Sequence, residues 1–241
     1  MVIDYSIFTN QGDRENNEDY TLVREKTNRY CFIVNDGLGG CGNGEVASQT
    51  AAVSIGNFFD KGIKDDFFKS SFICARENIE KKQNEVNSTD VMKTTSVVLT
   101  IDSGVAQWGH IGDSRLYYFK GSRLKTRTLD HSVPQMLVSM KEIKEQDIRF
   151  HKDRNRLLKA IGNRDPQLMP SVSKKYRISS GASFLLCTDG FWELITEEEM
   201  ISALKITQNA AEWIEKMSTL VLKKGLGNDM DNASAIGVRV L

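Results

Sequence analysis

The chain has 241 residues, 40% of them hydrophobic, and its 32 acidic and 32 basic residues balance. This length suits one large domain or two small ones, and the apolar content can bury a substantial core. The charge balance argues against nucleic acid or an anionic membrane as the main partner, and no apolar run approaches the roughly 20 residues of a membrane span. The start lacks signal-peptide features and the cysteines show no CxxC spacing, so we expect a reduced, cytoplasmic protein.

Strand signals come first along the chain and are followed by two helices. Loose alternation and apolar runs rich in β-forming residues predict strands at 2–9, 20–24 and 30–34. A turn at 26–28 would pair the second strand with the third. Apolar residues at helical spacing then predict helices over 45–59 and 65–85 that pack on the core.

Four short β-like runs follow, at 94–101, 105–111, 116–119 and 123–128. The Gly- and Asp-containing turns between them predict a meander. The next segment, 140–159, is dense in charges of both signs, which favours a solvated and mobile stretch.

The last part of the chain predicts strands at 172–178 and 183–188 and a closing strand at 233–241. Between them, Thr196 to Glu199 form a capping box that opens a helix, and 210–222 predicts another. No repeat, low-complexity tract or linker interrupts the sequence. We therefore expect one domain over 1–241 with layered α+β packing.

Two of the predicted buried strands end in the same dipeptide. Asp36-Gly37 follows one apolar run and Asp189-Gly190 follows another. In each, a carboxylate stands beside a residue that can adopt unusual φ values. This repeated strand exit suggests that both aspartates serve one shared site.

Several common motifs are excluded. Gly37 to Gly42 match the G-x-G-x-x-G dinucleotide fingerprint, but no second strand ending in an acidic residue follows the helix, and Asp36 would repel a pyrophosphate. The sequence has no Cys-based phosphate loop, no G-x-S-x-G elbow and no P-loop. The histidines lack the spacing of zinc ligands.

The remaining candidates for a functional site are aspartates at strand ends or in turns: Asp19, Asp36, Asp113, Asp189 and Asp231. Each alone could be an ordinary turn residue. Carboxylates that converge at one end of a sheet repel one another and raise each other's pKa. Hard divalent cations remove that cost, and an all-oxygen shell suits Mg²⁺ or Mn²⁺.

Phosphate-ester hydrolysis is the chemistry that such a cluster favours. Two ions about 3.5–4 Å apart can share a bridging water, lower its pKa towards ~7 and direct it at phosphorus. Phosphate monoesters need up to ~10²¹-fold acceleration, which metal charge can supply without a covalent nucleophile. Arg14, in the polar turn before Asp19, can offer a planar fork to the phosphate dianion.

In this order along the chain, these residues resemble the PPM family, the type 2C metal-dependent serine/threonine protein phosphatases. The resemblance runs nearly end to end. Its motifs are Arg14-x-x-Asn17-Glu18-Asp19, Asp36-Gly37-x-Gly39-Gly40, Gly44-Glu45-Val46-Ala47-Ser48, Thr94-Thr95, Gly112-Asp113-Ser114-Arg115, Asp130-His131-Ser132, Leu158-Lys159-Ala160-Ile161-Gly162, Thr188-Asp189-Gly190 and Asp231-Asn232.

The resemblance implies a fold and a set of metal ligands. The fold would be a four-layer α-β-β-α sandwich of two antiparallel sheets flanked by helices. Asp36 would bridge two core Mn²⁺ or Mg²⁺ ions, with the Gly37 carbonyl in the shell of one. Asp189 and Asp231 would complete the first ion's site, and Asp113 with Asp189 would hold a third, weaker ion seen in many members.

The remaining implied roles concern the substrate and the outer part of the cluster. Glu18 and Asp19 would belong to the same acidic group, mainly in outer or water-mediated positions. Arg14 would bind the phosphate, so that Arg14, Asp36 and Asp189 are the expected catalytic residues. Residues 138–160 fall where bacterial members have a mobile flap.

Leu38 departs from many eukaryotic members, which carry a histidine there that is proposed as the general acid. Leucine cannot donate a proton, so the acid stays unassigned and a bacterial-type enzyme is favoured. The resemblance implies phosphoserine and phosphothreonine proteins, the products of a Ser/Thr kinase, as substrates, and we expect a monomer. Two alternatives stay open: hydrolysis of a small phosphorylated metabolite on the same scaffold, and a non-catalytic binding member of the family.

Overall fold

The computed structural model describes residues 1–88 and 91–241, with the side chain of Cys41 outside the described part. Two antiparallel sheets form the centre. The first has the order β1 (Ile3–Asn10), β11 (Ala233–Val240), β10 (Ala182–Cys187), β6 (Arg115–Lys120), β7 (Arg123–Arg127). The second has the order β2 (Tyr20–Lys26), β3 (Arg29–Asn35), β4 (Ser96–Asp102), β5 (Val105–Ile111), β8 (Ser171–Val172), and β9 (Tyr176–Arg177) also pairs with β5.

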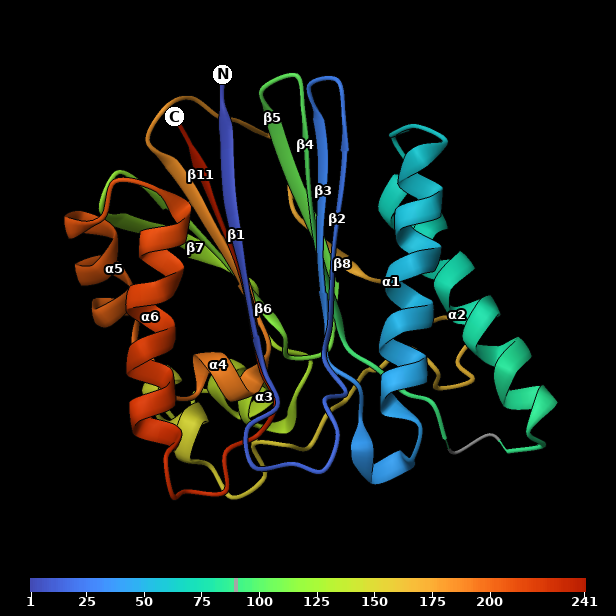
Figure 1. Cartoon of the computed structure of the whole chain (residues 1–241). Coiled ribbons are helices and arrows are strands. Elements are labelled where there is room, and N and C mark those ends of the chain that lie inside the picture. The colour runs from blue at the N-terminus through green and yellow to red at the C-terminus, as the bar shows by residue number, and fades with distance from the viewer. Residues whose placement is uncertain (89–90) are drawn as a thin grey trace.

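Helices cover the outer face of each sheet (Figure 1). The helices α1 (Gly44–Asp60) and α2 (Phe67–Glu85) pack on the second sheet, and α5 (Glu197–Ile206) and α6 (Ala210–Gly225) pack on the first. Shorter helices complete the set: α3 (Val133–Ser139), α4 (Asp189–Trp192), η1 (Gly39–Cys41) and η2 (Glu145–Phe150). Within the described residues, no helix combines the length and apolarity needed to cross a membrane. The predicted α-β-β-α sandwich is confirmed.

Strands at the middle of each sheet are buried on both faces. In β3, Phe32 contributes to the core between the sheets, whereas its neighbour Ile33 packs under the helices α1 and α2. In β10, Phe184 faces the core between the sheets and Leu185 packs under α5 and α6. Successive side chains alternate between the two faces of a strand, so both faces must be apolar here. This explains why these segments are continuous apolar runs in the sequence.

The predicted hairpin of β2 and β3 is confirmed, with Lys26 opposite Arg29 across the turn and Asn28 at φ 57°. Both predicted helices of the first half are present, and Thr196 with Glu199 forms the predicted capping box. The expected meander is wrong at one connection. Strand β5 ends at Ile111 in the second sheet and β6 begins at Arg115 in the first, so the turn between them crosses from one sheet to the other.

Two other segments differ from the sequence-based expectation. The single strand expected over 172–178 is two separate two-residue strands, β8 and β9. The charged segment 140–159 contains η2, and Ile148 within it is buried against the helix side of the first sheet. This burial shows that the segment is not solvated throughout.

Candidate active site

A cavity of about 740 Å³ opens at one end of the sandwich. The loops that follow β1, β3 and β10 gather at that end (Figure 1). The cavity lining includes almost all of the site residues expected from the sequence: Arg14, Glu18, Asp36, Gly37, Asp113, Asp189 and Asp231. Asp19 does not line the cavity but is buried, and it accepts a hydrogen bond from Thr188, the residue before Asp189. The structure therefore brings the predicted residues together, while their individual roles stay predictions.

The main chain of Asp36 is held by two consecutive threonines. The Asp36 N–H donates to the Thr95 hydroxyl (3.1 Å), and the Thr95 N–H and the Thr94 hydroxyl both donate to the Asp36 carbonyl (2.8 Å each). The Thr95 hydroxyl also shares a 2.6 Å hydrogen bond with the Ser114 hydroxyl. These bonds fix Asp36 relative to the turn that carries Asp113.

Asp189 is the first residue of α4, and one residue, Thr188, separates it from the end of β10. Its Oδ1 accepts the Gly190 N–H (2.7 Å). The residue before it, Thr188, donates its hydroxyl to Oδ2 of Asp19 (3.0 Å) and accepts the Ser234 N–H (2.9 Å). The turn formed by Thr188 and Asp189 therefore carries one candidate metal ligand, Asp189, and holds a second, Asp19, by a hydrogen bond.

Desolvation and mutual repulsion raise the pKa values of the carboxyl groups in this cluster. Desolvation, followed by the charges of Asp189 and Asp19, raises the pKa of Asp36 well above its ordinary value. Desolvation and the charge of Asp189 do the same to the pKa of Asp113. Desolvation, with smaller contributions from Asp189 and Asp231, raises the pKa of Asp19 to about 8. Desolvation and the charge of Asp231 also raise the pKa of Asp189, although a hydrogen bond to Asp36 opposes the shift.

This arrangement fits a divalent cation in its donor chemistry. Oδ1 of Asp19 is buried and has no hydrogen-bond partner among the described residues. The converging donors are carboxylate oxygens, which Mg²⁺ and Mn²⁺ prefer, and positive charge would offset their repulsion. In the part of the chain that the structure describes, however, no three His, Cys, Asp or Glu side chains already stand in ligating positions. Both oxygens of Asp231 are instead engaged by Arg14.

Arg14 and Asp231 form a two-point ion pair at the mouth of the cavity. Nε of Arg14 lies 3.0 Å from Oδ1 of Asp231, and Nη2 lies 3.1 Å from Oδ2. Their side chains keep 44% and 41% of their surface exposed, so both remain open to a ligand. The hydrogen bond and charge of Asp231 raise the pKa of Arg14, which keeps the guanidinium charged.

Glu18 lies against the glycine-rich loop. Its main-chain carbonyl accepts the Gly37 N–H (3.1 Å) and the Ser48 hydroxyl (2.6 Å). A methyl group at Gly39 would collide with the carboxylate of Glu18, and one at Gly37 would collide with the main chain of Gly44. Desolvation and the charge of Glu45 raise the pKa of Glu18. The glycines therefore allow the loop to close around this carboxylate.

The predicted flap segment contributes a wall of the cavity through Asn155, Arg156 and Leu157. Ion pairs attach this segment to the rest of the protein: Arg127 to Glu145 (2.6 Å), Arg149 to Glu197 (2.8 Å) and Arg154 to Glu193 (3.1 Å). A segment placed in this way can contact a substrate that occupies the cavity.

Some residues that organise the site had no role assigned from the sequence. Asn232 accepts the Glu18 N–H (2.8 Å) and donates to the carbonyls of Gln11 (2.7 Å) and Asn16 (2.9 Å). Two further residues of this kind are Thr188, whose hydroxyl donates to Asp19, and Trp192, whose indole N–H donates to the Asp113 carbonyl. Residues next to them in the sequence pointed to this part of the chain. Their hydrogen bonds to residues more than 70 positions away, however, leave no pattern in the local sequence.

Comparisons with known proteins find relatives over most of the chain. The serine/threonine phosphatase stp of Listeria welshimeri is 28% identical over 239 residues, covering 92% of this chain and 90% of its own length. The structure of the serine/threonine phosphatase Stp1 from Staphylococcus aureus superposes with a TM-score of 0.89 at 22% identity, covering 100% of this chain and 96% of that one, which shows a shared fold. The catalytic domain of the phosphatase PstP, described in complex with two manganese ions, has a TM-score of 0.80 at 25% identity and covers 99% of this chain and 98% of that one. The family model for protein phosphatase 2C matches residues 9–228. With its fold, its acidic cavity and this match over most of its length, the chain belongs to the protein phosphatase 2C family.

Proposed function

We propose that this protein hydrolyses phosphoserine and phosphothreonine esters in proteins with the help of bound Mn²⁺ or Mg²⁺. The observation that carries the proposal is the convergence of Asp36, Asp113, Asp189 and Asp231 with Arg14 on one cavity. The relatives named above are described as serine/threonine phosphatases, and the PstP structure holds two manganese ions, which supports the same activity and cofactor here.

Divalent ions at Asp36, Asp189 and Asp231, with a further ion at Asp113 and Asp189, would supply the positive charge that activates water as the nucleophile and polarises the phosphoryl group. The protein's own contribution is to hold those carboxylates in place. Thr94 and Thr95 fix the main chain of Asp36. The Gly190 N–H fixes the carboxylate of Asp189.

Arg14 would bind the phosphate dianion. Its planar guanidinium offers two parallel N–H donors, the geometry it uses towards Asp231 in this structure. Because Arg14 lines the cavity and its side chain is partly exposed, phosphate oxygens can take the place of the Asp231 carboxylate. Leu38 also lines the cavity but has no proton to give. Protonation of the leaving serine or threonine oxygen must therefore involve another group.

Hydrolysis of para-nitrophenyl phosphate and of a matched set of phosphoserine, phosphothreonine and phosphotyrosine peptides tests the proposal. We expect turnover only after Mn²⁺ or Mg²⁺ is added, with the phosphoserine and phosphothreonine peptides preferred. Asp36→Asn and Asp189→Asn should each lower kcat/KM by about 100-fold or more, because each removes a charge from the ligand set. Asp65→Asn, at a surface aspartate paired with Lys175, is the matched control and should have little effect. Turnover without metal, or full activity in Asp189→Asn, would contradict the proposal.

A further inference from the structure

The one-turn helix α4 links two of the candidate metal ligands through a single aromatic side chain. Asp189 is its first residue and Trp192 is its last. The Trp192 main-chain N–H donates to the Thr188 carbonyl (3.1 Å), which closes the turn. The Trp192 indole N–H donates to the main-chain carbonyl of Asp113 (3.0 Å). One residue therefore joins the helix that carries Asp189 to the main chain that carries Asp113.

Trp192 is itself held from one side by a stacked arginine. The guanidinium carbon of Arg115 lies 3.4 Å from the centroid of the Trp192 ring, and both residues are only 2% exposed. A guanidinium over the face of an indole, shielded from water, is among the stronger cation–π arrangements. The guanidinium carbon of Arg149, from η2, lies 5.5 Å from the same centroid.

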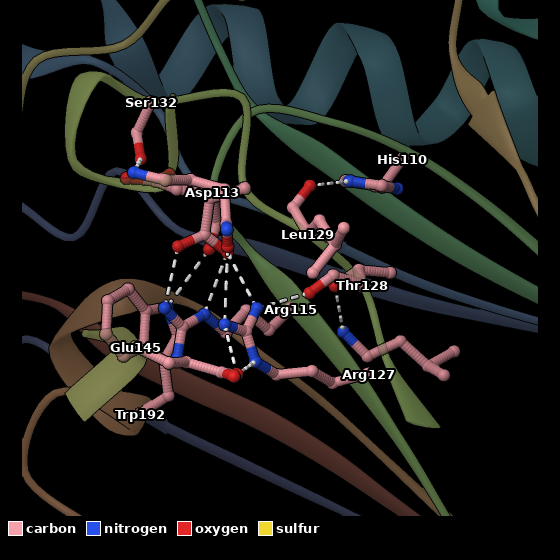
Figure 2. A network of polar contacts seen from close by, with 12 residues as sticks. His110, Asp113, Arg115, Arg127, Thr128, Leu129, Ser132, Glu145 and Trp192 are labelled. Carbon is pink, nitrogen blue, oxygen red and sulfur yellow. Dashed lines mark hydrogen bonds and ion pairs between the residues drawn. The ribbon is translucent and has the colours of Figure 1, made fainter. Parts of the chain in front are cut away.

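Arg115 has little freedom to move away from the indole (Figure 2). Its Nε and Nη2 donate to the two carboxylate oxygens of Asp130 (2.8 and 2.6 Å), and its Nη1 donates to the Tyr117 hydroxyl (3.1 Å). Nη1 of Arg127 lies 3.7 Å from the same Asp130 carboxylate. Breaking a buried, fully bonded ion pair is strongly unfavourable, so the guanidinium fixes the plane of the indole.

We propose that Trp192 is a positioning residue that sets the distance between Asp113 and Asp189, and that the Arg115–Asp130 pair holds Trp192 in place for this task. The inference rests on the proposed function, in which these two aspartates share an ion. Both aspartates line the cavity, and neither Trp192 nor Arg115 does. Partners that orient metal ligands typically change metal affinity by about 10–100-fold when they are removed.

Trp192→Phe tests the role of the indole N–H. The substitution keeps an aromatic face for Arg115 but removes the donor to the Asp113 carbonyl. The matched control is Trp213→Phe, because Trp213 is equally buried and its indole N–H also donates to a main-chain carbonyl, that of Met200 (3.1 Å), in the helix layer of the first sheet. Calorimetric titration of the metal-free full chain with Mn²⁺ gives the affinity of each class of ion.

We expect the weakest Mn²⁺ class of Trp192→Phe to bind about 10-fold or more weakly than in the wild type, with Trp213→Phe unchanged. Trp192→Phe that binds Mn²⁺ like the wild type, or Trp213→Phe that loses affinity equally, would overturn the inference. A wild-type protein that binds no Mn²⁺ would overturn the proposed function as well. The two failures are thereby distinguished.

A second measurement needs no substitution at Trp192 and covers the case in which that variant does not fold. The chain has three tryptophans, so 5-fluorotryptophan labelling gives three fluorine resonances, which Trp108→Phe and Trp213→Phe assign. On titration with Mg²⁺, which is diamagnetic, the Trp192 resonance should shift as the weakest class fills, while the Trp213 resonance should stay in place. A Trp192 resonance that does not respond would contradict the positioning role.

Discussion

Arg14 and Asp231 lie 217 residues apart in sequence and meet in a two-point ion pair, with Nε–Oδ1 and Nη2–Oδ2 distances of 3.0 and 3.1 Å. One is the proposed phosphate ligand and the other a proposed metal ligand. Each side chain thus neutralises the other in the structure described here. A phosphate dianion and a divalent cation would separate the pair and give each member a new partner of opposite charge.

Arg14→Ala should therefore weaken phosphate binding more than it slows the chemical step. A charge-assisted contact is worth about 1.5–3 kcal/mol, so KM for para-nitrophenyl phosphate should rise about 10- to 100-fold with a smaller change in kcat. Arg24→Ala, which removes another arginine paired with an aspartate (Asp60, 3.7 Å), is the control. An unchanged KM in Arg14→Ala would contradict the assigned role.

Metal-free protein should lose stability as the pH rises. The pKa of Asp19 is raised from 3.8 to about 8, so the folded state holds this proton more tightly than the unfolded chain does. Its contribution to stability is complete below about pH 4 and disappears as the pH passes 8. The raised pKa values of Asp36, Asp113 and Asp189 act in the same direction.

Thermal unfolding at pH 6 and pH 8 measures this effect. The Tm of the metal-free wild type should fall between the two values, and the fall should be smaller in Asp19→Asn, which cannot titrate at this position. Mn²⁺ should restore stability at pH 8, because it binds the folded state, displaces the remaining protons and offsets the repulsion among the carboxylates. If the Tm falls by the same amount between pH 6 and pH 8 in Asp19→Asn and in the wild type, Asp19 is not the source of the pH dependence.

His131 should have the opposite effect at acidic pH. Its ring stacks on His110 with centroids 4.6 Å apart, its Nδ1 accepts the Gly112 N–H (3.1 Å), and desolvation and His110 lower its pKa to about 3. The unfolded chain takes up a proton near pH 6.5 and the folded protein does not, so stability falls as the pH drops from about 6.5 towards 3.

His131→Asn should reduce this acid sensitivity, because the Asn side-chain oxygen can accept the Gly112 N–H without titrating. Urea midpoints at pH 7 and pH 5 give the comparison. The control is His151→Asn, because the Nδ1 of His151 also accepts a main-chain N–H (from Asp153, 3.1 Å). It shows how much of the change comes from replacing any such histidine by asparagine. A change in urea midpoint between pH 7 and pH 5 that is the same in His131→Asn and in the wild type would contradict the assignment.

Gly112→Ala should destabilise the crossing between the two sheets. Gly112 has φ +98°, and a Cβ there would lie 2.6 Å from the Thr95 side chain. Backbone strain and crowding together should cost about 2–5 kcal/mol of unfolding free energy. Gly121 also has positive φ (+54°) but no atom within 4 Å of its Cβ position, so Gly121→Ala should cost only about 1 kcal/mol. Equal losses in the two variants would show that contact with Thr95 is unimportant.

Long elements with strong periodicity were predictable from the sequence, as the hairpin of β2 and β3 and the helices α1 and α2 show. The family and the sandwich are likewise confirmed. The turn at Gly112 was misjudged because a turn that changes sheets has the same local residues as a hairpin turn. Helix α4 is one turn long, too short to show a helical period, and its Trp192 is recognisable only from its contact with Asp113.

The site was predictable as a group of residues but not as a set of contacts. Asp36 and Asp189 stood out because each ends a buried strand beside a glycine. The pairing of Arg14 with Asp231 and the bond from Thr188 to Asp19 depend on how the two sheets bring distant loops together. No local pattern encodes such a distance.

Anomalous diffraction from crystals grown in Mn²⁺ tests the central claim most directly, because it locates each ion and its ligands at once. We expect manganese peaks between the carboxylates of Asp36, Asp189 and Asp231, with Arg14 turned away from Asp231. Peaks elsewhere, or these three carboxylates close together with no manganese between them, would contradict the account.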